Sequence, residues 1–129
     1  MFLFFISIII ELLNKGAIMD TKATLAALSA LAQESRLSVF RLLVQVGPQG
    51  MAATKIGEQL GISPSSMSFH LKELAHAELV TAKHEGRFVI YSANFVVMNA
   101  LVGFLTENCC GGNVCSPNGV CITTEDAQS

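Results

Sequence analysis

The first 108 residues of this 129-residue chain contain no cysteine, and all four cysteines fall within the last twenty-one residues. A secreted domain that depends on disulfides spreads its cysteines through the fold, because a small core needs the covalent links. The main domain is therefore expected to fold without them, as one globular unit with tails. The expected location is a reducing cytoplasm, where the cysteines would be free thiols.

The chain also lacks an apolar run long enough to cross a membrane. Its N-terminal apolar stretch covers residues 1–13, whereas a span takes about 20 apolar residues. That stretch has neither the basic start nor the small-residue cleavage site of a secretory signal. Two interpretations stay open for residues 1–18: they precede a true start at Met19, or they add a packing segment to a dimer. No membrane partner is expected.

Net positive charge, the usual footprint of a nucleic-acid-binding surface, is missing as well. The formal charge is −2, and the four basic and four acidic residues between positions 50 and 92 cancel. No nucleophile, general base or phosphate-binding loop can be assembled from the sequence, so an enzyme is not expected. None of His70, His76 and His84 has a cysteine nearby in sequence, which argues against a mixed metal site.

Apolar residues recur at helical spacing along most of the chain. Residues 21–32 carry leucines three apart, and residues 34–46 form a second helix that a Gly-Pro pair ends. Residues 52–60 form a short third helix. After a tight turn at Gly61-Ile62, Ser63-Pro64 starts a fourth helix, because a hydroxyl cap precedes proline at the first helical position. This helix continues to about residue 77.

The fourth helix has one apolar face and one polar face. Met67, Leu71 and Leu74 recur on the apolar face. Short or polar side chains occupy the other face, which lets the helix N-terminus come close to DNA and its amides meet phosphate oxygens. The residues expected to bind DNA from this helix are Ser63, Ser65, Ser66, Ser68, His70 and Lys72.

Residues 80–93 change to the alternating period of a two-stranded hairpin, with its turn at Glu85-Gly86. A hairpin directly after a helix-turn-helix is a wing, and Arg87 beside the turn would contact the DNA backbone or minor groove. The predicted fold is mainly α with a small β-hairpin, a winged helix-turn-helix. An ordinary helical hairpin would not carry the tight turn, the donor-rich face and the wing in this order.

The last predicted helix, residues 94–108, is apolar on two faces, with one stripe through Met98 and Val102 and another through Val97 and Leu101. Such a helix needs two surfaces to pack against, its own domain and a second subunit. A homodimer through the first and last helices is therefore expected. The predicted divisions are an apolar extension at 1–18, a DNA-binding and dimerisation domain at 19–108, and a cysteine-containing flexible tail at 109–129.

Three motifs together resemble the ArsR family of metalloregulatory repressors. Residues 31–43 (LAQESRLSVFRLL) are similar to the family's second-helix signature. Residues 65–74 (SSMSFHLKEL), with Ala77 and Leu79-Val80, resemble its recognition helix, and Glu85-Gly86-Arg87 followed by Tyr91 matches its wing. The resemblance covers about residues 19–110. It implies a homodimeric repressor that occupies double-stranded operator DNA and leaves when its inducer binds.

The sequence departs from the family's patterns at three places. Many arsenic-responsive members carry a Cys-Val-Cys pair in the third helix, whereas residues 53–57 here are ATKIG, without a thiol. The family's carboxylate and histidine zinc site on the last helix is also missing. Glu78 stands where the family usually has glycine, which predicts that the helix end is not in a left-handed conformation.

The thiols instead lie at Cys109, Cys110 and Cys115, just past the last helix. This arrangement resembles a subset of the family in which a vicinal pair plus a third cysteine binds As(III) or Sb(III). The chemistry is consistent, because a soft cation with a lone pair favours three thiolates. The flexible Gly111-Gly112 link would let Cys115 fold back. Cys121 is an alternative ligand.

Other interpretations of the cysteines stay open. The tail could carry them by chance, or it could simply oxidise. A repressor of the same fold could sense redox state or reactive sulfur by linking Cys109 or Cys110 to Cys115 or Cys121. In a different class, a small zinc-sequestering protein would hold Zn(II) with all four thiolates and have no operator affinity.

Overall fold

The computed structural model describes residues 3–6 and 19–112. Residues 3–6 are helical, and the main body is built from helices and three strands. In chain order its elements are α2 (Thr21–Leu31), α3 (Glu34–Val46), β1 (Met51–Ala52), α4 (Ala53–Leu60), α5 (Pro64–His76), β2 (Val80–Glu85), β3 (Phe88–Ala93) and α6 (Phe95–Leu105), followed by a 3₁₀ turn, Cys109–Gly112. This is the winged helix-turn-helix architecture expected from the sequence.

Side-chain caps set where the helices begin. Asp20 Oδ1 accepts from the Ala23 N–H at 2.7 Å at the start of α2, and Gln33 Oε1 accepts from the Arg36 N–H at 2.9 Å at the start of α3. These bonds satisfy amides that have no partner inside the helix. The predicted starts of α2, α3 and α5 agree with the structure.

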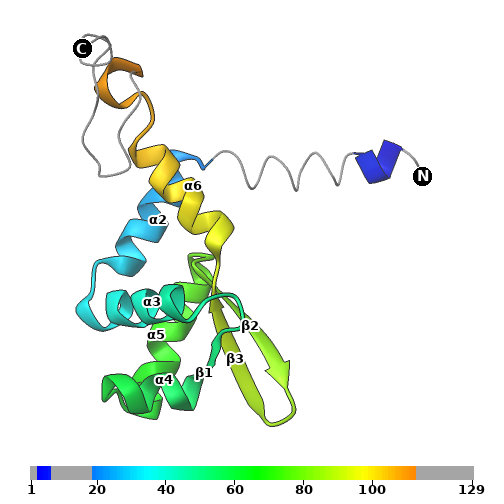
Figure 1. Cartoon of the computed structure of the whole chain (residues 1–129), viewed down its shortest axis with the longest axis vertical. Helices are drawn as coiled ribbons and strands as arrows, with labels where there is room; N and C mark the ends of the chain where they lie inside the picture. The colour runs from blue at the N-terminus through cyan, green and yellow to red at the C-terminus, as the bar shows by residue number, and fades with distance from the viewer. Residues whose placement is uncertain (1–2, 7–18, 113–129) are drawn as a thin grey trace, which may run out of the picture.

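The core lies where α3, α5 and the sheet meet. Its fully buried side chains include Val39 and Leu43 from α3, Leu71 and Leu74 from α5, and Ile56 from α4. Helices α2 and α6 lie side by side at one end of the molecule, whereas α4, the start of α5 and the hairpin lie at the other end (Figure 1). Among the described residues no helix is both long and apolar enough to cross a membrane.

Helix α2 packs on the core through Ala27, Ala30 and its last residue, Leu31, whereas its other two leucines are exposed. Ala27 and Ala30 are buried, whereas the Leu25 side chain is 61% exposed and that of Leu28 is 38% exposed. The alanine face lets α2 approach the domain closely. The leucine face is left uncovered on the single chain.

The sheet has one strand more than the predicted hairpin. Strands β2 and β3 pair antiparallel from Val80 with Ala93 to Glu85 with Phe88, as expected, and β1 pairs with the other edge of β3. Gly50 precedes β1 with φ 72°, and a Cβ there would come within 2.4 Å of the Tyr91 carbonyl oxygen. Only glycine allows this close approach. A two-residue strand is too short to produce a periodic pattern in the sequence.

The end of α5 corrects one expectation. Glu78 has φ 62°, so the chain is left-handed there although the residue is not glycine. The Glu78 N–H donates to the Ala75 carbonyl and the Leu79 N–H donates to the Leu74 carbonyl, each at 3.0 Å. This pair of bonds is the Schellman pattern, which requires a left-handed residue after the helix. The buried Leu79 side chain holds the chain in this turn.

We expect Glu78→Gly to raise the free energy of unfolding by about 0.5–1 kcal/mol. A left-handed conformation costs an L-residue about 1–2 kcal/mol, and the greater chain entropy of unfolded glycine offsets part of the gain. In urea unfolding the midpoint should rise with an unchanged slope. Glu58→Gly, at an exposed position inside α4, is the control and should lower the midpoint. An unchanged or lowered midpoint for Glu78→Gly would contradict this explanation.

Candidate nucleic-acid interface

The turn between α4 and α5 is built by two glycines. Gly61, which caps the end of α4, has a left-handed φ of 66°, and the Ile62 N–H then donates to the Gly57 carbonyl at 3.0 Å. A Cβ on Gly57 would meet the Ile62 carbonyl oxygen at 2.9 Å, so the turn closes tightly only over glycine. This geometry confirms the tight turn predicted between the two helices.

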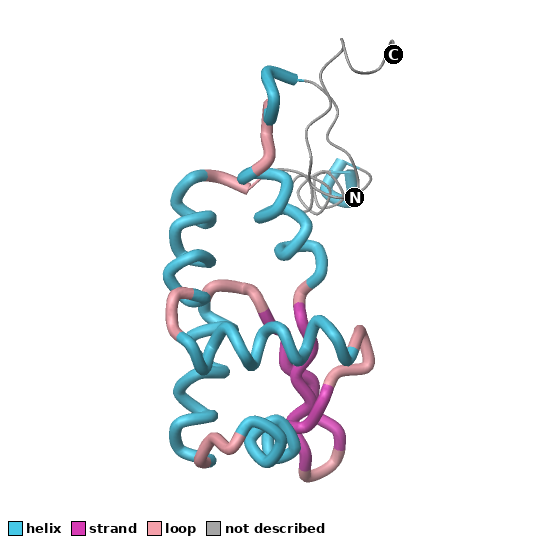
Figure 2. Tube along the Cα trace, turned by 60° about the vertical axis from the view of Figure 1, so that its left-hand side comes forward, coloured by secondary structure: helices cyan, strands magenta, loops and turns pink. Residues whose placement is uncertain are grey.

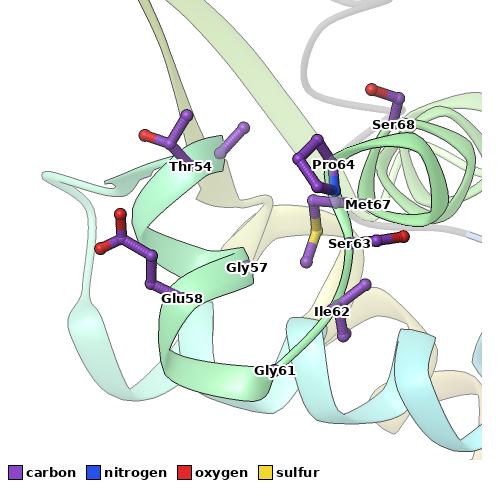
Figure 3. Close-up of a pocket in the computed structure, with 10 residues that line it drawn as sticks. Thr54, Gly57, Glu58, Gly61, Ile62, Ser63, Pro64, Met67 and Ser68 are labelled. Carbon is purple, nitrogen blue, oxygen red and sulfur yellow. The ribbon is translucent and has the colours of Figure 1, made fainter.

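A hollow separates α4 from the first turn of α5. In Figure 3 the Met67 side chain extends into it, whereas Ser63 and Ser68 point away from it. Ser63 caps α5: its Oγ accepts from the Ser66 N–H at 3.4 Å and donates to the Ser66 Oγ at 3.1 Å. The predicted cap and the proline at the first helical position are both present. The first turn of α5 therefore presents its hydroxyls to the outside, whereas the Ser66 and Met67 amides already donate to Ser63.

The predicted DNA-binding residues do not all occupy the same surroundings. Those on the outer side of α5 are exposed, and these are Ser63, Ser65, Ser66, Ser68 and Lys72. His70 is only half-exposed, and its Nδ1 is buried without a hydrogen-bond partner. A base-contacting role for His70 stays a prediction, and Nδ1 is not the atom presented to solvent.

One residue of the outer face was missed in the sequence. Phe69 has 55% of its surface exposed, although it is a large aromatic residue among polar neighbours. Its position two residues after the buried Met67 already places it on the far side of the helix, because successive residues turn by about 100°. This spacing is visible in the sequence, but the predicted DNA-binding set contains only polar side chains, and a phenylalanine falls outside it.

The wing projects away from the helices. Every residue from Thr81 to Phe88 is exposed, and the hairpin extends beyond the helical body in two views (Figures 1 and 2). Gly86, with φ 61°, takes the first position of the two-residue turn and Arg87 takes the second. Lys83 Nζ lies 3.3 Å from Glu85 Oε1 in an exposed ion pair of small energetic value. Arg87 is thus the exposed cation at the tip of the wing, as predicted.

A second hollow lies between α5 and the wing. Its lining includes Ser68, Lys72 and His76 from α5 and Tyr91 from β3. Polar groups from the helix and the hairpin therefore face one space on the outer side of the domain. Lys72 was predicted from the sequence as a helix residue alone, and its proximity to the wing could be seen only in the fold.

The cysteines lie beyond α6. The Cys109 N–H donates to the Thr106 carbonyl at 3.0 Å, and Asn108 and Cys110 have left-handed φ values of 55° and 56°. Cys109 and Cys110 are both disulfide-bonded, instead of the free thiols expected from the sequence. The predicted ligands Cys115 and Cys121 lie outside the described residues. Within residues 3–6 and 19–112 no group of three or more metal-binding side chains occurs.

Known proteins share this domain. A family model described as a helix-turn-helix domain matches residues 31–81. The nodulation protein NolR of Rhizobium meliloti is 27% identical over 88 residues, which are 68% of this chain and 70% of that protein. The transcriptional repressor SdpR of Bacillus subtilis (strain 168) is 34% identical over 55 residues, which are 43% of this chain and 61% of that protein.

A solved structure has the same winged helix-turn-helix fold. The homodimeric winged helix-turn-helix DNA-binding domain of a possible ArsR-family transcriptional regulator from Mycobacterium bovis superimposes with a TM-score of 0.54. It is 26% identical and covers 67% of this chain and 81% of its own. The chain therefore carries a winged helix-turn-helix DNA-binding domain. In sequence and fold this domain is similar to those of NolR, SdpR and the possible ArsR-family regulator from Mycobacterium bovis.

Proposed function

We propose that this protein is a homodimeric transcriptional repressor in the cytoplasm that binds double-stranded operator DNA. The observation that carries the proposal is the exposed, hydroxyl-rich first half of α5 beside a projecting wing with a cation at its tip. Short donors allow the helix to enter the major groove, and the wing reaches the backbone next to it. The repressor SdpR and the DNA-binding domain from Mycobacterium bovis support this function.

The uncovered apolar face supports the dimer. Leu25 and Leu28 on α2, and Val102 and Leu105 on α6, are all exposed on the single chain. These four residues, called the α2/α6 face below, lie on neighbouring helices at one end of the molecule. Burying them against a second copy removes apolar surface from water, at about 25 cal/mol per Å². Two recognition helices could then enter successive major grooves about 34 Å apart.

The proposed inducer is As(III) or Sb(III), bound by Cys109, Cys110 and Cys115 as thiolates. The two described cysteines begin four residues after the end of α6, so a ligand bound there would lie close to one helix of the proposed dimer interface. Because both are disulfide-bonded in the structure, binding requires their reduction first. Once the thiols are free, three thiolates suit a trivalent soft ion. A change at this turn, transmitted through α6, would alter the spacing of the recognition helices, with a coupling of about 1–3 kcal/mol.

A second candidate, a redox-sensing repressor, is favoured by one observation. Cys109 and Cys110 are disulfide-bonded, which is the oxidised state that such a sensor would use. In this function hydrogen peroxide would take two electrons and two protons from a thiol pair, which gives the disulfide and two water molecules, and a cellular dithiol would reduce the disulfide to the two thiols while becoming a disulfide itself. In both candidates the change would begin at the turn Cys109–Gly112 and reach the recognition helices through α6. The two candidates therefore differ only in the inducer.

Fluorescence anisotropy on the DNA upstream of its own gene tests both candidates. The reduced protein should bind this duplex, and arsenite or antimonite should release it under anaerobic conditions. Release by hydrogen peroxide, without any response to arsenite, would favour the redox sensor. Tight zinc binding with no affinity for any duplex would contradict both and support metal sequestration.

We expect Arg87→Ala to weaken binding to operator and non-operator DNA by the same factor. An exposed cation at the wing tip contacts phosphates, which carry no sequence information. The slope of log affinity against log salt should fall by about one unit per protomer. Lys22→Ala removes an exposed cation from α2, at the opposite end of the domain, and should leave the slope unchanged. Loss of affinity for the operator alone would contradict the assignment of Arg87 to the backbone.

A further inference from the structure

Phe69 is an isolated apolar side chain on the polar outer face of α5. It is 55% exposed, whereas Met67 and Leu71 on either side of it in sequence are buried. Its neighbours on the exposed side are Ser65, Ser68 and Lys72, all polar. The domain thus leaves one aromatic ring in water on the helix that is proposed to enter DNA.

The Phe69 ring has a defined neighbour. Its centroid lies 5.9 Å from that of His70, with the ring planes at 64°, which is the edge-to-face arrangement favoured by aromatic pairs. The half-buried His70, whose Nδ1 is fully covered, therefore supports Phe69 from the side. His70 acts here as a positioning residue for an exposed ring.

The size of the exposed patch decides what could cover it. A protein partner needs a contiguous apolar surface of several hundred Å², and on this face Phe69 is surrounded by hydroxyls and an ammonium group. In the major groove, by contrast, the base edges offer a single apolar group, the 5-methyl group of thymine. The apolar surface of one phenylalanine ring is therefore sufficient to cover one thymine methyl group, although it is too small for a protein partner. Phe69 is also the sixth residue of α5, within the half that meets base edges in helix-turn-helix proteins.

We propose that Phe69 contacts the 5-methyl group of a thymine in each half-site and so selects A·T over other pairs there. This inference rests on the proposed DNA-binding function. It assigns a specificity-determining role to an apolar residue on a face that otherwise presents hydrogen-bond donors and a cation. The exposed serines and Lys72 would then position the helix on phosphates and polar base edges around that contact.

Replacing thymine by deoxyuridine tests this contact, because it removes only the methyl group and keeps the base pair. The probe is the highest-affinity duplex recovered from a randomised library, prepared once with thymine and once with deoxyuridine. Wild-type protein should bind the deoxyuridine duplex at least about fourfold more weakly per methyl group, the value for one buried methylene. Phe69→Ala should bind the thymine duplex more weakly and bind both duplexes equally.

Phe88→Ala is the matched control, because Phe88 is also an exposed phenylalanine (58%) but lies on the wing. It should keep the wild-type ratio of the two affinities, which shows that removing an exposed phenylalanine elsewhere does not abolish the preference; equal binding of both duplexes by Phe69→Ala excludes altered DNA shape as its cause. A wild-type protein that binds both duplexes equally, or a Phe69→Ala variant that keeps the preference, would overturn the inference while DNA binding stands. If no duplex is enriched from the library, the proposed function itself fails and this inference fails with it.

Discussion

Val102→Glu should convert the dimer into monomers and lower operator affinity by at least about 100-fold, or about 2.7 kcal/mol. Val102 is 54% exposed on α6, so a glutamate there leaves the fold of its own chain intact. In a dimer that buries the α2/α6 face, the same carboxylate would lose its water without gaining a partner. A monomer then binds one half-site and loses the advantage of two linked contacts. Sedimentation and anisotropy measure the two effects.

The choice of Val102 separates assembly from folding. Leu101, its neighbour, is only 6% exposed and belongs to the core, so a charge there would unfold the chain and prove nothing about assembly. Gln45→Glu makes the same charge change at an exposed position on α3 and should leave both the dimer and its affinity unchanged. A Val102→Glu protein that sediments as a dimer with normal affinity would contradict the proposed interface. So would a stable wild-type monomer at micromolar concentration.

The double variant Cys109→Ser, Cys110→Ser should lose all response to arsenite and methylarsenite and still bind the operator. Neither side chain belongs to the core, so removing both sulfurs should leave the fold and the DNA affinity unchanged. A singly methylated arsenical has only two open positions and would use this pair. Anisotropy on preformed complexes, with each arsenical added under reducing conditions, measures the response.

Cys115→Ser is the informative single variant. It should weaken the arsenite response, because inorganic As(III) would lose its third thiolate, and leave the methylarsenite response in place. An unchanged arsenite response in Cys115→Ser would assign the third ligand to Cys121. Release of DNA by arsenite from the double variant would end the proposal for this inducer site.

Strong local signals explain why much of the fold could be predicted from the sequence. Ser63 before Pro64 is a helix start that does not depend on tertiary contacts, and the structure confirms it. The Gly61 turn and the two-residue hairpin at Gly86 likewise depend on backbone geometry that glycine alone takes easily. Elements with such signals, the helix-turn-helix and the wing, were placed correctly.

The remaining features depend on contacts between distant segments. The pairing of β1 with β3 joins residues about forty apart in sequence. The Ser92 Oγ also donates to the Pro48 carbonyl at 3.1 Å, and this bond holds the segment before β1 against β3. A non-glycine residue such as Glu78 does not by itself favour a left-handed conformation. It adopts one here because the Leu79 N–H donates to the Leu74 carbonyl and the Leu79 side chain is buried in the core. The environment of His70 depends on the packing around α5. The roles of the cysteines in inducer binding stay a prediction.

Selection of duplexes from a randomised library by the reduced protein, followed by sequencing, tests the central claim most directly. A homodimer that places two copies of α5 in successive major grooves predicts an enriched inverted repeat. Its half-sites should lie about one helical turn apart, and it should be bound at least about 10³-fold more tightly than a scrambled duplex. Enrichment of no motif, or of one without two-fold symmetry, would contradict the dimeric operator-binding repressor proposed for this chain.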